Sequence, residues 1–190
     1  DGRWESEPLP WDYREEVLMR LKDTDMLLDM DTGDGGFLLS LRHPYELTCA
    51  TESDERDYES CVEQLAPLGI RTMFCNVDEE ELPFEDDMFD MVLSRHGGYM
   101  IEELFRVLKP GGQLVLGAAC WPAAMNALRR WMSAGTESTP VNRCTLQTRL
   151  TDLSFEQVSW QRTGLGTGVM TAWKRKPALD GVQADGGMIR

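Results

Sequence analysis

The apolar positions of the chain fall into two kinds of segment that alternate along it. Short apolar runs have the length and composition of buried strands, and they cover residues 26–30, 46–51, 70–75, 89–94 and 113–119. Apolar residues at helical spacing lie before and between these runs, at 11–22, 37–41, 54–66, 101–108 and 122–132. This alternation predicts an α/β protein with a mostly parallel, doubly wound sheet covered by helices on both faces.

The C-terminal part of the chain follows a different pattern. Residues 155–160 and 169–174 predict two further strands, and only the glycine-rich segment 163–168 separates them. Without a helix between them, they should pair as an antiparallel hairpin at the edge of a seven-stranded sheet. We expect a single domain over residues 1–176. In it, residues 1–24 form an N-terminal segment and helix, 134–150 a mobile loop, and 177–190 a disordered tail.

A glycine-rich turn directly follows the first predicted strand. The strand ends near the acidic Asp29, and the turn contains Asp31, Gly33 and Gly35 before a short helical segment begins. Glycine has no Cβ and adopts positive φ, so a ligand can lie directly against the backbone. The helix that follows presents unpaired N–H groups. These features predict a nucleotide-type cofactor site.

Composition and charge restrict the partners. Acidic residues outnumber basic ones by 33 to 19, for a net charge of −14, so we expect no nucleic-acid partner. No apolar run is long enough to span a membrane, and residues 1–10 do not resemble a signal peptide. The five cysteines are scattered without a C-x-x-C pair, and no loop has the ligand spacing of a cation site. We expect a cytoplasmic protein without a metal.

Four blocks in order give the chain a recognisable signature. They are Leu28-Asp29-x-x-x-Gly33-x-Gly35, then Glu52, then Asn76-Val77-Asp78 leading to Leu82-Pro83-Phe84-x-Asp86-x-x-Phe89-Asp90-x-Val92, and finally Leu104-x-Arg106-Val107-Leu108-Lys109-Pro110-Gly111-Gly112. This set resembles the class I S-adenosylmethionine-dependent methyltransferases, in particular the small-molecule branch that includes the ubiquinone/menaquinone methyltransferase-like domains. The resemblance implies a Rossmann-like fold, S-adenosylmethionine as cofactor, S-adenosylhomocysteine as product and a small-molecule substrate.

The resemblance also implies roles for individual residues. Asp29 would face the methionine ammonium, and Glu52 would accept hydrogen bonds from the ribose hydroxyls. Asp78 would accept from the adenine amino group, with Val77 and Phe84 flanking the ring. Ser94 ends the fourth predicted strand, where such sheets place ligands. The cofactor-binding set is therefore Asp29, Asp31, Gly33, Gly35, Glu52, Val77, Asp78 and Ser94.

Asp31 departs from the family pattern, because it stands where the first glycine of the motif is expected. Its carboxylate either turns away from the ligand or crowds the methionine end. The alternative function is therefore a non-catalytic methyltransferase-like binding or regulatory protein with an altered cofactor loop. A nicotinamide-dependent oxidoreductase is disfavoured, because the G-x-G-x-x-G spacing fails at Leu38.

Catalytic candidates follow the fourth predicted strand. His96 has a pKa suited to accepting a proton from the acceptor, and Tyr99 lies close behind it in the sequence. The substrate cover must come from the N-terminal segment, from residues 121–150, or from the second subunit of a homodimer. Several aromatic residues either pack in the core, which is the default, or line an aromatic substrate pocket: Trp4, Trp11, Tyr13, Trp121 and Trp131.

Overall fold

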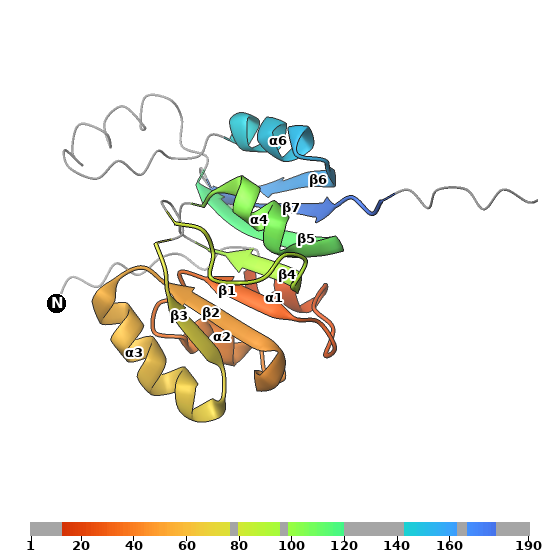
Figure 1. Ribbon diagram of the computed structural model, residues 1–190. Coiled ribbons are helices and arrows are strands. Elements are labelled where there is room, and N and C mark those ends of the chain that lie inside the picture. The colour runs from red at the N-terminus through yellow and green to blue at the C-terminus, as the bar shows by residue number, and fades with distance from the viewer. Residues whose placement is uncertain (1–12, 77–79, 96–98, 120–142, 163–166, 178–190) are drawn as a thin grey trace, which may run out of the picture.

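The computed structural model describes residues 13–76, 80–95, 99–119, 143–162 and 167–177 (Figure 1). Within them, seven strands form one sheet in the order β3-β2-β1-β4-β5-β7-β6. All neighbouring pairs from β3 to β5 are parallel, and β7 is antiparallel to both of its neighbours. The predicted Rossmann-like α/β sheet with a C-terminal hairpin is confirmed. The strands are β1 (Leu27–Met30), β2 (Thr48–Glu52), β3 (Arg71–Phe74), β4 (Phe89–Ser94), β5 (Leu108–Ala119), β6 (Phe155–Arg162) and β7 (Thr167–Lys174).

Helices cover both faces of this sheet. The first face carries α1 (Tyr13–Leu18), α2 (Gly36–Ser40) and α3 (Glu55–Leu65), whose apolar residues share one buried cluster. The second face carries α4 (Ile101–Val107) and α6 (Arg143–Asp152), together with apolar residues of the segment between β3 and β4. The sheet is therefore the middle layer of three.

The side chains of β1 alternate between the two faces, as expected for a strand. Leu27 belongs to the cluster under α1, α2 and α3, whereas Leu28 and Met30 belong to the cluster on the opposite face. Asp29 has the same parity as Leu27 and therefore points toward the first face. All four residues of β1 are buried. An acidic side chain thus lies in an otherwise apolar position at the end of the central strand.

Two segments differ from the sequence-based expectation. Residues 143–150, expected as part of a loop, belong to α6, in which Leu146 and Leu150 are completely buried; residues 134–142 lie outside the described part of the chain. The Pro-Gly composition of residues 109–112 predicts a turn, yet they begin β5 beside an irregularity in its pairing with β4. Gly111 accommodates this start with a φ of 85°.

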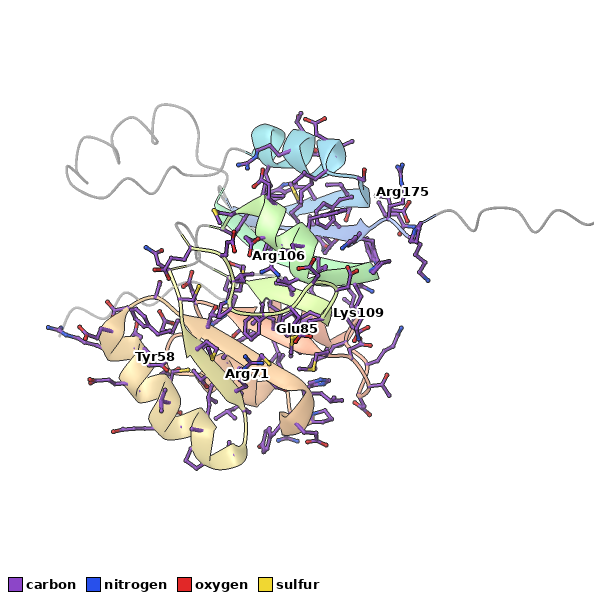
Figure 2. The ribbon with its side chains drawn as sticks, in the orientation of Figure 1. Tyr58, Arg71, Glu85, Arg106, Lys109 and Arg175 are labelled. Atoms are coloured by element: carbon purple, nitrogen blue, oxygen red, sulfur yellow. The ribbon has the colours of Figure 1, made fainter. Side chains whose placement is uncertain are left out.

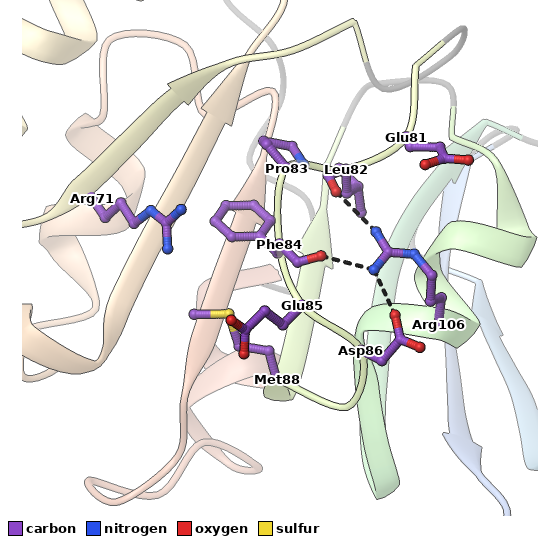
Figure 3. Close-up of a pocket in the computed structure, with 9 residues that line it drawn as sticks. All are labelled: Arg71, Glu81, Leu82, Pro83, Phe84, Glu85, Asp86, Met88 and Arg106. Atoms are coloured by element: carbon purple, nitrogen blue, oxygen red, sulfur yellow. Dashed lines mark hydrogen bonds and ion pairs between the residues drawn. The ribbon is translucent and has the colours of Figure 1, made fainter.

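Arg106 of α4 stabilises the connection from β3 to β4 through hydrogen bonds (Figure 3). Its guanidinium donates to the carbonyl oxygens of Leu82 at 2.9 Å and Phe84 at 2.8 Å, and to the carboxylate of Asp86 at 2.8 Å. Glu103 binds the same guanidinium and accepts from the backbone N–H of Leu82 at 2.8 Å. This network holds Leu82 and Phe84 against the second face of the sheet.

We expect Arg106→Lys to lower the free energy of unfolding by about 2 kcal/mol, measured by urea denaturation. A lysine ammonium cannot satisfy two carbonyls and two carboxylates in one plane, so part of this network loses its donors. Arg149→Lys is the matched control, because Arg149 pairs with Glu102 on the exposed surface and should cost about 0.5 kcal/mol or less. Equal losses in the two variants would contradict the role given to Arg106.

Candidate functional site

The loop after β1 has an unusual backbone. Asp31, Gly33 and Gly35 have φ angles of 48°, 67° and 82°, all in the left-handed region. A Cβ on Gly35 would lie 2.9 Å from the side chain of Leu65, so this glycine is required for packing of the loop on α3. A Cβ on Gly33 would have no neighbour within 4 Å. Of the two predicted glycines, Gly33 therefore has open space beside its Cα.

Asp31 adopts the left-handed conformation that the missing glycine would have favoured, which aspartate tolerates better than most residues. Its Oδ1 accepts a hydrogen bond of 2.9 Å from the hydroxyl of Ser53, just after β2. The carboxylate is thus drawn toward the end of the neighbouring strand.

Glu52 joins the loop to the end of β2. One oxygen of its buried carboxylate accepts from the N–H of Gly33 at 2.7 Å, and the other accepts from Ser53 at 2.9 Å and Asp54 at 3.0 Å. Because each carboxylate oxygen has two acceptor directions, the oxygen bound to Gly33 keeps one for a further donor. Glu52 therefore shapes the loop while one direction stays available.

Asp29 is completely buried at the end of β1. Its Oδ2 accepts a hydrogen bond of 2.6 Å from the hydroxyl of Thr32, and its Oδ1 has no hydrogen-bond partner. Burial raises the pKa of Asp29 to about 6, with Thr32 and Arg95 acting in the opposite direction. This carboxyl therefore changes its protonation state within two units of neutral pH.

Arg95 lies directly after β4 and reaches across to the same loop. Its Nη2 donates to the carbonyl of Thr32 at 3.1 Å, and its guanidinium carbon lies 4.1 Å from the centre of the Phe37 ring. Its Nε is buried without a hydrogen-bond partner. The sequence-based set missed this residue, although its position between Ser94 and His96, at the end of a parallel strand, would have been a sufficient signal.

Tyr13 packs against the apolar cluster on the first face of the sheet, beside Phe37. Its hydroxyl donates to the carbonyl of Val115 on β5 at 2.7 Å, and its ring lies 5.5 Å from that of Phe37. Burial raises the pKa of Tyr13 well above its usual value, and the charge of Asp29 adds to this effect. Among the aromatic candidates, Tyr13 therefore packs in the core and ties α1 to β5.

Ser94 is buried and Tyr99 is partly buried. Ser94 is fully buried and its hydroxyl has no hydrogen-bond partner. Burial raises the pKa of Tyr99 far above neutrality, so its phenol stays protonated and can donate a hydrogen bond but cannot act as a base at physiological pH. His96, Val77 and Asp78 lie outside the described residues, and their roles stay predictions.

A separate open pocket of about 590 Å³ lies beside β3 rather than at the glycine loop. Figure 3 shows Arg71, Glu85 and Arg106 among the residues that line it, and Figure 2 shows where these three residues lie in the fold. Arg71 lies 5.2 Å from the centre of the Phe84 ring, and Arg106 is engaged by the loop network described above. Of the residues expected at the cofactor, this pocket includes Phe84 and none of the residues at the ends of β1 and β2. The glycine loop is therefore the better candidate.

Comparisons with known proteins bear on the family and the fold. Residues 28–116 match a family model described as "Methyltransferase domain". No curated protein matched the chain in a comparison of sequences. In the described parts of the chain, no helix combines the length and the apolar character needed to cross a membrane.

Solved structures share the fold at low sequence identity. A chain from the complex of the Haloferax volcanii Trm112 methyltransferase activator with a methyltransferase has a TM-score of 0.71 and 16% identity, over 86% of this chain and 88% of that one. The YcgJ protein of Bacillus subtilis has a TM-score of 0.67 and 14% identity, over 87% and 99%. A geranyl diphosphate methyltransferase solved with S-adenosylmethionine has a TM-score of 0.66 and 16% identity, over 85% and 84%. Residues 28–116 therefore match a methyltransferase domain, and the described parts of the chain share the fold of these solved structures.

Proposed function

We propose that this protein transfers the methyl group of S-adenosylmethionine to a small-molecule acceptor. The observation that carries the proposal is the open space beside the Cα of Gly33, in a loop that binds the buried carboxylates of Asp29 and Glu52. S-adenosylmethionine carries a sulfonium, an ammonium and a ribose diol, so acidic acceptors and close backbone suit it better than a lysine-bearing phosphate loop.

The residues present fit this cofactor. Asp29 has an acceptor atom without a partner, Glu52 keeps one acceptor direction, and Gly33 has free space on one side. Asp29 would hold the ammonium, Glu52 a ribose hydroxyl, and Gly33 the closely approaching backbone. When bound, the cofactor supplies a methyl group on a sulfonium that is already a good leaving group. The protein then has to align the acceptor and exclude water.

The remaining roles extend the same proposal. Asp78 would accept from the adenine amino group with Val77 beside the ring, and His96 would take a proton from the acceptor. Tyr99, held in its protonated form, would orient the acceptor as a hydrogen-bond donor. Kinship with the ubiquinone/menaquinone branch stays a prediction, as do the cytoplasmic location and a homodimer.

Two observations support a small-molecule acceptor. The chain has a net charge of −14, which repels nucleic acid. One structural neighbour is named for geranyl diphosphate, a small molecule.

Cofactor binding is tested by isothermal calorimetry and thermal unfolding with S-adenosylmethionine, S-adenosylhomocysteine and NAD⁺. We expect both adenosyl compounds to bind, and at 100 times Kd to add about 2.7 kcal/mol to the free energy of unfolding. NAD⁺ should give neither heat nor stabilisation. If both adenosyl compounds fail as well, the alternative of a non-catalytic protein with an altered loop is favoured.

Binding should weaken as the pH falls through about 6. In the free protein, Asp29 with its pKa of about 6 becomes protonated there and loses its attraction for the ammonium, at a limit of tenfold in Kd per pH unit. Calorimetry between pH 5 and 8 should show this slope for S-adenosylhomocysteine. Asp29→Asn should bind more weakly and without the slope. 5′-Methylthioadenosine, which lacks the amino-acid end, is the control ligand and should show no slope with the unaltered protein.

The stability of the free protein should depend on Asp29 in the opposite sense. Because its pKa is raised on folding to about 6, the folded state retains this proton more tightly than the unfolded chain does. The contribution of Asp29 is thus fully present below about pH 4 and is lost as the pH rises through 6. A difference between the unaltered protein and Asp29→Asn that does not change over this range would contradict the raised pKa.

Asp31→Gly should leave the affinity for S-adenosylhomocysteine within about threefold, because Ser53 already holds the carboxylate at the end of β2. Both Asp31→Ala and Asp31→Gly lose that hydrogen bond, but only alanine carries a Cβ that is strained at the left-handed φ. Asp31→Ala should therefore unfold about 1–2 kcal/mol more easily than Asp31→Gly in urea. A gain of tenfold or more in affinity for the glycine variant would show that Asp31 obstructs the site.

A further inference from the structure

Buried polar atoms without hydrogen-bond partners occur at the carboxyl ends of the neighbouring strands β1, β2 and β4. Among the described residues, five buried side-chain atoms lack a hydrogen bond, and four of them belong to Asp29, Thr51, Ser94 and Arg95. The pairing of β1 with its neighbours sets Asp29 opposite Ala50 and Met30 opposite Ser94, so these residues lie at the same ends of adjacent parallel strands. Thr51 and Ser94 have the strand parity of the second face of the sheet, whereas Asp29 and Arg95 both contact Thr32 of the glycine loop. Unpaired buried polar groups are costly, and the presence of two of them beside this loop points to a ligand.

Two of these atoms have opposite character. Oδ1 of Asp29 is an acceptor on a carboxylate, and Nε of Arg95 is a donor on a guanidinium. Thr32 keeps the two charges apart, because its hydroxyl donates to Asp29 and its carbonyl accepts from Arg95. The charge of Arg95 acts on Asp29, yet no ion pair joins them among the described residues.

Phe37 fixes the position of the cation. The guanidinium lies over its ring at 4.1 Å, which favours a stacked arrangement and keeps Arg95 beside Thr32 rather than against Asp29. The loop therefore presents an anion and a cation on either side of one residue. Groups of opposite charge that bind the same residue can match the ammonium and carboxylate of an α-amino acid.

We propose that Arg95 binds the α-carboxylate of the methionyl group while Asp29 faces its ammonium, so that the site selects a zwitterion. This assignment rests on the proposed function. Without Arg95, that carboxylate would meet the acidic side chains of Asp29, Asp31 and Glu52. Arg95 is partly exposed, and its Nε, which has no partner in the protein, is the donor left for the ligand carboxylate while Nη2 stays on Thr32.

The test compares S-adenosylmethionine with decarboxylated S-adenosylmethionine, which lacks only the carboxylate. Calorimetry on the unaltered protein should show at least tenfold tighter binding of S-adenosylmethionine. Arg95→Gln should raise the Kd of S-adenosylmethionine at least tenfold and change the Kd of the decarboxylated compound less than threefold. Arg95→Lys should keep part of the preference, because it retains the charge without the fork. Arg56→Gln, which removes an equally charged but exposed side chain on α3, should change neither affinity.

A merely structural role for Arg95 predicts a different result. If Arg95 only stabilises the loop, Arg95→Gln raises the Kd of both compounds by the same factor, and this outcome overturns the proposal. Equal affinity of the unaltered protein for the two compounds also overturns it. If neither compound binds the unaltered protein, the proposed function itself fails and the assignment of Arg95 fails with it.

Discussion

Three backbone N–H groups from two separate segments converge on the carboxylate of Glu52, and this convergence sets the shape of the loop that follows β1. Hydrogen bonds from N–H groups to a charged acceptor are among the stronger ones in proteins, at about 1.5–3 kcal/mol each. The hydrogen bond to Gly33 holds the loop against the end of β2. In this position Gly33 has open space beside its Cα, and Asp29 is completely buried. The residue predicted to bind the cofactor thus also builds the site.

The buried polar atoms at the site that have no partner lower the stability of the fold. Asp29 is buried with one oxygen unpaired, and its pKa is raised to about 6 because water is excluded. Arg95 has a buried nitrogen that is likewise unpaired. A fold selected for stability alone would have replaced such groups with apolar side chains. Their presence at the ends of adjacent parallel strands is the pattern expected where a protein keeps strained charges for a ligand.

The sequence predicted the architecture because the signals for it are local. The apolar runs, the intervening helical spacing and the glycine-rich turn define the sheet and its hairpin, and the positions of Asp29, Gly33 and Glu52 follow from the strand ends. The helical nature of residues 143–150 was not predicted, because only Leu146 and Leu150 mark its buried side among polar residues. The network around Arg106 and the contacts of Arg95 with Thr32 and Phe37 depend on partners distant in sequence, which periodicity does not reveal, although the place of Arg95 just after a strand could have marked it as a candidate. Asp31 was predicted to turn either way, and its bond to Ser53 shows which segment it contacts.

The central claim is that the loop between Asp29 and Glu52 binds a cationic adenosyl compound. A crystal structure of the protein with S-adenosylhomocysteine tests this most directly, because it locates the ligand among the side chains. The account predicts ligand density over Gly33, with the amino-acid end between Asp29 and Arg95 and a ribose hydroxyl on Glu52. Density confined to the pocket beside Arg71 and Phe84, with the glycine loop unchanged and bare, would contradict it.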